Sequence, residues 1–168
     1  MKPTFLKQLI LEMNGIPELR LKLLVLLFRL GSVLENKKRI LCFFYIPFNI
    51  IYVIYSKIFL SLEIPLGTKI GWGLKIYHGH SLVINKQSNI GSSFTVRHSV
   101  TIGNILRADG SESICPIIGN NVEVGCNSTI IGPIHIGNNC KIGAGVTVHK
   151  NIAANTTVVP LGYRTISK

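Results

Sequence analysis

The most constraining feature of the sequence is a six-residue period that runs from Ile64 to Val148. Aliphatic residues recur every six positions in three uninterrupted runs: Ile64, Ile70 and Ile76; Ile84, Ile90, Val96 and Ile102; and Ile118, Val124, Ile130, Ile136, Ile142 and Val148. Glycine directly follows many of them. A fixed period of this kind is the signature of a solenoid, in which each repeat buries its apolar face only by stacking on its neighbours.

We interpret the period as a three-sided parallel β-helix. Each hexad forms one short strand, three hexads form one coil, and the aliphatic residue of each hexad points inward. Glycine and asparagine are expected to turn the corners at positive φ. The predicted fold class is therefore mainly β, with a β-helix over residues 63–168 and a short α-helical region over residues 1–62.

The period breaks twice, and these breaks are the places to look for function. Between Ile76 and Ile84 the step is eight residues, which inserts two residues around the segment Tyr77–His80. Between Ile102 and Ile118 the step is sixteen, from which we expect about four extra residues in a polar loop over residues 104–116. Loops positioned by a rigid scaffold commonly carry binding and catalytic residues.

Residues 1–62 are apolar and basic, and their leucines recur at helical spacing, which predicts two or three helices. The segment Ile40–Ser56 has no charged residue, but it contains Pro47 and falls short of the roughly 18 to 20 residues that a membrane span needs. A helix packed on its own protein or lying on a membrane surface is favoured over a true span. Packing between the subunits of a trimer would also explain the apolar surface of residues 1–62. Basic residues at positions 37–39 suit contact with an anionic leaflet.

The charge balance indicates an anionic partner without choosing one. The 168 residues include 18 Lys and Arg against 7 Asp and Glu, a net charge of +11, spread evenly along the chain. Nucleic acid is disfavoured because no docking motif or aromatic interleaving is present. Four cysteines without a CxxC pair, and no cleavable signal peptide, favour a reducing cytoplasm.

Three segments resemble a known family. They read LEIPLGTKIGWGLKIYHGHSLVIN, IGSSFTVRHSVTIGN and IIGNNVEVGCNSTIIGPIHIGNNCKIGAGVTV. They are similar to the hexapeptide-repeat acyltransferases, and within them to the serine acetyltransferases and the shorter enzymes that O-acetylate bacterial surface sugars. The resemblance implies a left-handed coil, acetyl-CoA as donor, and a homotrimer in which the loop of one subunit covers the groove of the next. Val100 and Ile134 are expected to be outward apolar residues of such packing.

The resemblance also implies the catalytic residues. His78 matches the family's general base, a role for which imidazole is suited at neutral pH. Glu63 matches the carboxylate that orients this base. His98 holds the same hexad position as His78, so the two should lie one strand spacing apart and share the work, provided that the two inserted residues lie after His78. His80 remains the alternative base. No metal is expected, because no cysteine or carboxylate at ligand spacing joins these histidines.

Coenzyme A should occupy a groove of small residues that ends in basic ones. The pairs Gly125-Cys126 and Gly143-Ala144 lie one coil apart, and by resemblance Cys126 and Ala144 hold the pantetheine arm. Lys150 and Arg164 are candidates for contact with the phosphates.

Two departures from the serine acetyltransferases bear on the acceptor. Tyr77 replaces the aspartate that precedes the catalytic histidine, and the loop lacks the Asp-Arg-His stretch of those enzymes. We therefore predict a cytoplasmic O-acetyltransferase acting on a small or lipid-linked sugar of capsule, O-antigen or exopolysaccharide, with peripheral contact to an anionic membrane. Serine O-acetyltransferase is the alternative, and a non-catalytic solenoid scaffold is a minor one.

Overall fold

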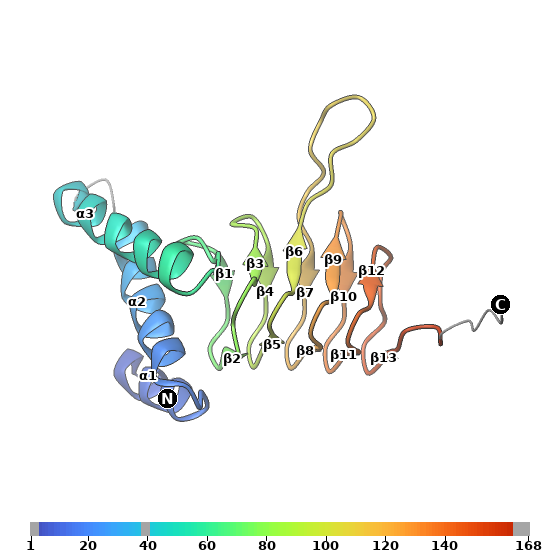
Figure 1. The fold of residues 1–168 in the computed structure, drawn as a ribbon, viewed down its shortest axis with the longest axis horizontal. Helices are drawn as coiled ribbons and strands as arrows, with labels where there is room; N and C mark the ends of the chain where they lie inside the picture. Colours follow the sequence, from blue (N-terminus) through green and yellow to red (C-terminus); the bar gives the residue numbers. More distant parts are fainter. Residues whose placement is uncertain (1–3, 38–40, 163–168) are drawn as a thin grey trace, which may run out of the picture.

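The computed structural model describes residues 4–37 and 41–162. A group of helices at the N-terminal end adjoins a straight column of coils that leads to the C-terminus (Figure 1). The helices are α1 (Phe5–Asn14), α2 (Leu19–Asn36) and α3 (Cys42–Val53), and α3 runs on into the π-helical segment η1 (Ile54–Phe59). The helical region predicted from the sequence is confirmed.

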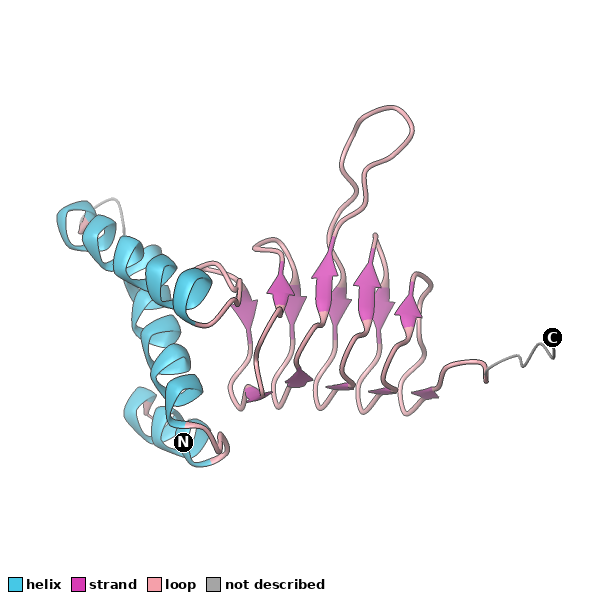
Figure 2. Ribbon diagram, in the orientation of Figure 1, coloured by secondary structure: helices cyan, strands magenta, loops and turns pink. Residues whose placement is uncertain are grey.

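Thirteen short strands form the column within the described residues (Figure 2). They are β1 (Lys69–Ile70), β2 (Lys75–Tyr77), β3 (Val83–Ile84), β4 (Asn89–Ile90), β5 (Thr95–Arg97), β6 (Thr101–Gly103), β7 (Ile117–Ile118), β8 (Glu123–Val124), β9 (Thr129–Ile131), β10 (His135–Ile136), β11 (Lys141–Ile142), β12 (Thr147–Val148) and β13 (Thr157–Val158). They pair in parallel as three sheets, in the orders β1-β4-β7-β10, β13-β11-β8-β5-β2 and β12-β9-β6-β3. The three-sided parallel β-helix is confirmed.

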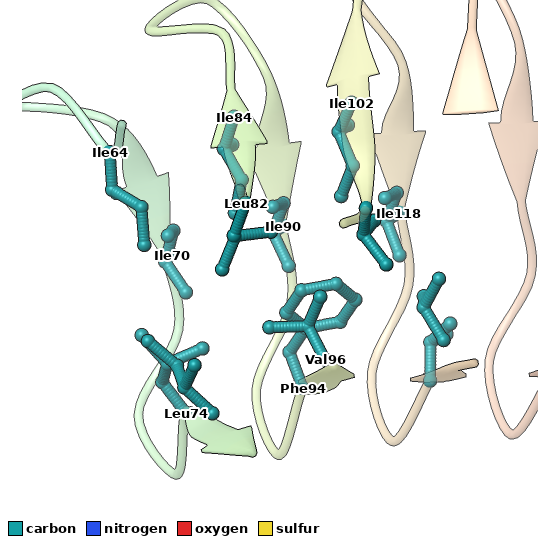
Figure 3. Close-up of a cluster of buried hydrophobic side chains, with 14 of the residues drawn as sticks. Ile64, Ile70, Leu74, Leu82, Ile84, Ile90, Phe94, Val96, Ile102 and Ile118 are labelled. Atoms are coloured by element: carbon teal, nitrogen blue, oxygen red, sulfur yellow. The ribbon is translucent and has the colours of Figure 1, made fainter. Parts of the chain in front are cut away.

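The aliphatic residue of each hexad fills the interior of the column. Ile76, Ile84 and Ile102 are fully buried, and Figure 3 shows such side chains pointing into successive coils. Burial of this ladder is the main favourable term that holds the coils together. Val100 and Ile134 also lie inside, with 0% and 6% of their surface exposed. The expectation that they face outward is wrong, because the residue two positions before each aliphatic position points inward as well.

The glycines that follow the aliphatic residues have a different role from the predicted one. They are absent from the positive-φ positions, which are occupied later in the hexads by residues such as Asn121, Asn127 and Asn139. Gly125 is needed because neighbouring coils approach closely: a Cβ atom there would lie 2.5 Å from the backbone nitrogen of Ala144. Close stacking, rather than turning, explains this glycine.

A buried ion pair fastens the helices to the first coil. Glu12 of α1 accepts hydrogen bonds from Arg29 of α2 at 2.6 and 2.8 Å and from the backbone nitrogens of Gly73 and Leu74. Arg29 in turn donates to carbonyl oxygens of the first coil. Because charges this deeply buried are stable only when fully paired, the network fixes where α2 meets the column.

Both breaks in the period lie where they were predicted, but the second is larger. Lys75 pairs with Thr95, twenty positions on, so the first break adds two residues to the usual eighteen. Thr95 pairs with Glu123, twenty-eight positions on. The loop over residues 104–116 therefore adds ten residues, not four. It protrudes from the column as a hairpin closed by a bridge between Leu106 and Glu112 (Figure 1).

Candidate active site

His78 and His98 lie side by side at the corner that follows β2 and β5. Strand pairing places Tyr77 against Arg97, and the two imidazoles come next with ring centroids 6.0 Å apart and planes at 70°. The predicted proximity of the two histidines is confirmed. The two extra residues therefore fall after Tyr77, so they do not disturb the register of β2 and β5.

His78 occupies a strained turn that the N-terminus of α2 holds. Its backbone has φ of 64°, a left-handed conformation that histidine tolerates better than most residues. Its backbone nitrogen donates to Oε1 of Glu18 at 3.1 Å, and its carbonyl accepts from Arg20 at 3.3 Å. Glu18 and Arg20 also bind each other at 2.6 Å. These contacts over-determine the turn, which is how strained backbone persists at functional sites.

The same Glu18 carboxylate faces the imidazole of His78. Its Oε1 lies 3.4 Å from Nδ1, while 68% of the His78 side chain remains exposed. A hydrogen bond from Arg20 keeps the pKa of Glu18 below its usual value, although burial partly opposes the effect, so Glu18 is ionised at neutral pH. A carboxylate at Nδ1 favours the tautomer that leaves Nε2 free to accept a proton.

Glu63 does not meet His78 in the single chain. Its backbone pairs with Val83, on a neighbouring face of the coil, and its carboxylate lies 2.9 Å from Nζ of Lys57. The carboxylate that the structure brings to His78 is Glu18. The resemblance to the family therefore pointed to a different residue from the one that the geometry provides here.

The other two histidines of the corner differ in their surroundings. Nε2 of His80 lies 3.0 Å from Nη2 of Arg20, which can only donate, so this nitrogen acts as an acceptor and is not available as a base. Nδ1 of His98 is buried and has no hydrogen-bond partner among the described residues. These environments favour His78 as the base and leave His98 suited to contact a reacting group.

An open cleft lies beside this corner. It has a volume of about 720 Å³ and is lined by Glu18, Leu19, Arg20, Leu23 and Tyr55. Arg20 and Glu18 thus form both the wall of the cleft and the clamp on the His78 turn. The cleft therefore adjoins the residues that hold the His78 turn, although none of the histidines lines it.

The corner continues along the column into the predicted donor groove. The pairing of β5 with β8 and of β8 with β11 carries the positions of His78 and His98 on to Cys126 and Ala144. Backbone bonds from Asn127 to His98 and from Gly145 to Cys126 hold this register. Gly125 and Gly143 lie one position earlier in each coil, so the corner is lined by backbone and small side chains.

This corner leaves room for a narrow ligand, as the expected pantetheine contact requires. A Cβ atom at Gly145 would meet nothing within 4 Å, and Ala144 is exposed, so the surface is open and low at this point. A narrow apolar chain with amide groups can pack against such a surface and bond with exposed backbone atoms.

The two residues predicted to contact the phosphates of coenzyme A, Lys150 and Arg164, are not placed beside this corner by the structure. Lys150 is exposed but follows β12, at the next corner of the coil rather than beside Ala144. Arg164 lies outside the described residues. Within residues 4–37 and 41–162, no cluster of three or more potential metal ligands is formed.

Comparisons with known proteins decide the family. The model of the family Bacterial transferase hexapeptide (six repeats) matches residues 115–150. A protein of Escherichia coli K12 named as a colanic acid biosynthesis acetyltransferase, WcaB, is 40% identical over 114 residues, which are 67% of this chain and 68% of the relative. The chain belongs to the hexapeptide-repeat acyltransferases. Its column is thus the left-handed β-helix of this family.

Serine acetyltransferases are also similar to this hexapeptide-repeat acyltransferase. The enzyme of Helicobacter pylori is 37% identical over 108 residues, which are 64% of this chain and 62% of that enzyme. The crystal structure of serine acetyltransferase isoform 3 from Entamoeba histolytica, in complex with cysteine, superimposes with a TM-score of 0.75 at 25% identity, covering 96% of this chain and 59% of that one. These relatives have acetyl transfer in common, and the protein is an acetyltransferase.

Sequence reasoning missed Glu18 and Arg20. Both lie some sixty residues before the histidines that they contact, in the helical region rather than in the hexads. The local signal is only that Glu18 follows Pro17 at the start of α2, which marks a helix start and not a site.

Proposed function

We propose that the protein transfers the acetyl group of acetyl-CoA to a hydroxyl of a sugar used in surface polysaccharide biosynthesis. The observation that carries this proposal is the surroundings of His78. Tyr77 packs against the guanidinium of Arg97, with 5.3 Å between the cation and the ring centroid, where the serine acetyltransferases place an aspartate. Glu123 pairs with Arg97 at 3.0 Å and neutralises its charge, so the surface beside His78 offers an aromatic ring and a paired guanidinium in place of a free carboxylate. Such a surface suits the ring of a sugar better than the ammonium group of an amino acid.

The remaining carboxylate at the corner supports the same preference. Glu18 is already engaged by Arg20 and by the backbone of His78, so it is not free to bind a substrate ammonium group. The 40% identity with a relative named for colanic acid biosynthesis, over two thirds of both chains, also supports a sugar acceptor.

The proposed mechanism is direct attack by the acceptor hydroxyl. Acetyl-CoA supplies an activated acetyl group as a thioester. His78 accepts the hydroxyl proton at Nε2 as the new ester bond forms, and afterwards returns it to the departing thiol sulfur. Glu18 holds Nδ1 and stabilises the imidazolium ion that forms in between. His98 and backbone N–H groups of the corner provide donors for charge that develops on the carbonyl oxygen.

We further propose a homotrimer in the cytoplasm, with active sites between subunits. The loop over residues 104–116 leaves the column after β6, whereas the histidines follow β2 and β5 on a different sheet. Figure 1 shows the loop on the side of the column away from the sheet that contains β2 and β5. A loop so placed is better positioned to cover a neighbour's histidines than its own.

L-Serine is the second candidate acceptor. The similarity to the Helicobacter pylori enzyme and to the Entamoeba histolytica structure supports it as directly as the other relative supports a sugar.

Release of free thiol from acetyl-CoA tests the proposal. The purified protein is assayed with nucleotide sugars, lipid-linked sugars and L-serine, each in parallel with His78→Ala. We expect turnover with a sugar that disappears in the variant. Turnover with L-serine alone would show that L-serine is the acceptor and contradict the sugar proposal. If the protein neither turned over acetyl-CoA nor bound it, a non-catalytic scaffold would be the remaining interpretation.

A further inference from the structure

The helix formed by α3 and η1 exposes mainly apolar side chains to solvent, which is the reverse of an ordinary surface helix. Among residues Cys42–Phe59, every exposed side chain except Lys57 is apolar. We define the α3 face as the large members of this set, which are Phe43, Phe44, Ile46, Ile50, Ile51, Val53, Ile54, Ile58 and Phe59, with 37% to 83% of their surface exposed. Soluble proteins seldom leave a continuous apolar face of this size unpartnered.

The polar side chains of this helix point into the protein instead. The hydroxyl of buried Tyr52 donates to the carbonyl of Ile64 at 2.6 Å, and that of Tyr55 donates to the carbonyl of Arg20 at 3.0 Å. Tyr45 packs near Glu35, and desolvation, with a contribution from that carboxylate, raises its pKa to about 12. The inward face is thus tied to α2 and to the first coil.

These bonds decide how the helix can meet a bilayer. Cys42–Phe59 is long and apolar enough to span a membrane by length and composition, with 11% of its residues buried in the protein. A spanning orientation, however, would carry its bonded neighbours Ile64 and Arg20, and the charged pair Lys57–Glu63, into hydrocarbon. An orientation parallel to the surface immerses the α3 face alone and keeps every inward bond.

Charge on the same part of the molecule indicates which bilayer. Residues 1–62 hold nine Lys and Arg but three acidic residues. All three acidic residues are engaged: Glu12 with Arg29, Glu18 with Arg20, and Glu35 with Lys86. The surplus cations, including exposed Lys37 at the end of α2, complement an anionic leaflet, whereas Lys57 is paired with Glu63 and is not one of them.

We propose that the α3 face lies in the surface of an anionic bilayer and docks the enzyme on it, with the helix parallel to the membrane. Apolar side chains enter the boundary between headgroups and acyl chains, and the basic residues contact lipid phosphates. The proposal does not depend on which acceptor the enzyme uses.

Vesicle flotation tests the proposal. The full-length protein is floated with phosphatidylcholine vesicles that contain one quarter phosphatidylglycerol, and with phosphatidylcholine alone. We expect binding to the anionic vesicles that weakens in 0.5 M NaCl. The double variant Ile50→Glu/Ile58→Glu should lower the bound fraction by at least about tenfold. Leu106→Glu on the protruding loop, where 73% of the side chain is exposed against 71% for Ile58, should bind as the unaltered protein does.

Two further measurements keep the outcomes distinct. Circular dichroism shows whether the double variant is folded, and nitroxide labels on Phe44→Cys, Ile51→Cys and Ile58→Cys report depth. Equal shallow depths support the parallel orientation, whereas a deep central label would overturn it. Failure of the unaltered protein to float, with an oligomer in lipid-free buffer that Ile50→Glu/Ile58→Glu disrupts, would instead assign the α3 face to a second copy of the chain.

Discussion

The carboxylate of Glu18 lies 3.4 Å from Nδ1 of His78, although sixty residues separate the two in the chain. The same carboxylate accepts a hydrogen bond from the His78 backbone. One side chain at the start of α2 therefore controls both the turn that presents the imidazole and the orientation of its ring.

Replacing this carboxylate should slow the reaction without weakening donor binding. We expect Glu18→Gln to lower kcat by about 10- to 100-fold, because the imidazolium ion loses its stabilising partner. The KM for acetyl-CoA should stay within a factor of about two, since the donor positions lie elsewhere along the corner. Glu35→Gln, at the far end of α2, serves as the control. A rise in KM with an unchanged kcat would assign Glu18 to substrate binding instead.

Glu18 should also make stability depend on pH. Its pKa is lowered in the folded protein, so its contribution to stability is present above its unfolded pKa and is lost as the pH falls through the folded one. Unaltered protein and Glu18→Gln should therefore differ in Tm at pH 7 and converge below about pH 4. Thermal unfolding followed by circular dichroism across this range checks the expectation, and a constant difference would contradict it.

The two histidines beside the clamp should differ in their effect on rate. We expect His78→Ala to lower kcat by about 10²- to 10⁴-fold, as for loss of a general base. His80→Ala should cost less than about tenfold, because Nε2 of His80 is occupied by Arg20. Steady-state thiol release measures both variants. A larger loss in His80→Ala than in His78→Ala would make His80 the base.

Bound CoA should slow the alkylation of Cys126 and leave the alkylation of Cys42 unchanged. All four cysteines are free thiols: Cys126 is partly exposed at the proposed donor corner, Cys42 is exposed on α3, and Cys115 and Cys140 are buried. Brief alkylation followed by peptide mass spectrometry should show slower modification of Cys126 when CoA is present and an unchanged rate at Cys42. Equal rates at Cys126 with and without CoA would place the donor elsewhere.

Because neighbouring coils stack closely, adding a single methyl group at position 125 should lower the stability of the fold. A Cβ atom at position 125 would meet the backbone of the next coil at 2.5 Å, so we expect Gly125→Ala to destabilise the fold by about 1–3 kcal/mol. Gly162→Ala, where nothing lies within 4 Å, should change the stability by less than about 0.5 kcal/mol. Urea unfolding of both variants compares the two, and equal stabilities would show that the coils can separate locally.

The hexads were predictable because inward positions recur at a period that chain geometry imposes. Residues such as Ile76 and Ile102 therefore revealed the coil, and counting along it brought His78 to His98. Counting failed across the second break, since a sixteen-residue step does not show on which sheet the chain resumes. That required the pairing of Thr95 with Glu123. The contact between Glu18 and His78 could not be predicted from the sequence for a related reason. It depends on how α2 packs against the first coils, and no local sequence pattern encodes that packing.

The loop between β6 and β7, with its ten added residues, can vary without changing the spacing of the histidines and Cys126. Thr95 meets Glu123 in register whatever lies between β6 and β7, so the histidines and Cys126 keep their spacing. Lengthening a surface loop costs little, about 0.6 kcal/mol for each doubling. In the proposed trimer, where this loop covers the histidines of a neighbour, exchange of the segment would alter the acceptor side of the site while the corner that holds His78 and His98 stays fixed. In such an architecture, acceptor choice can change faster than chemistry.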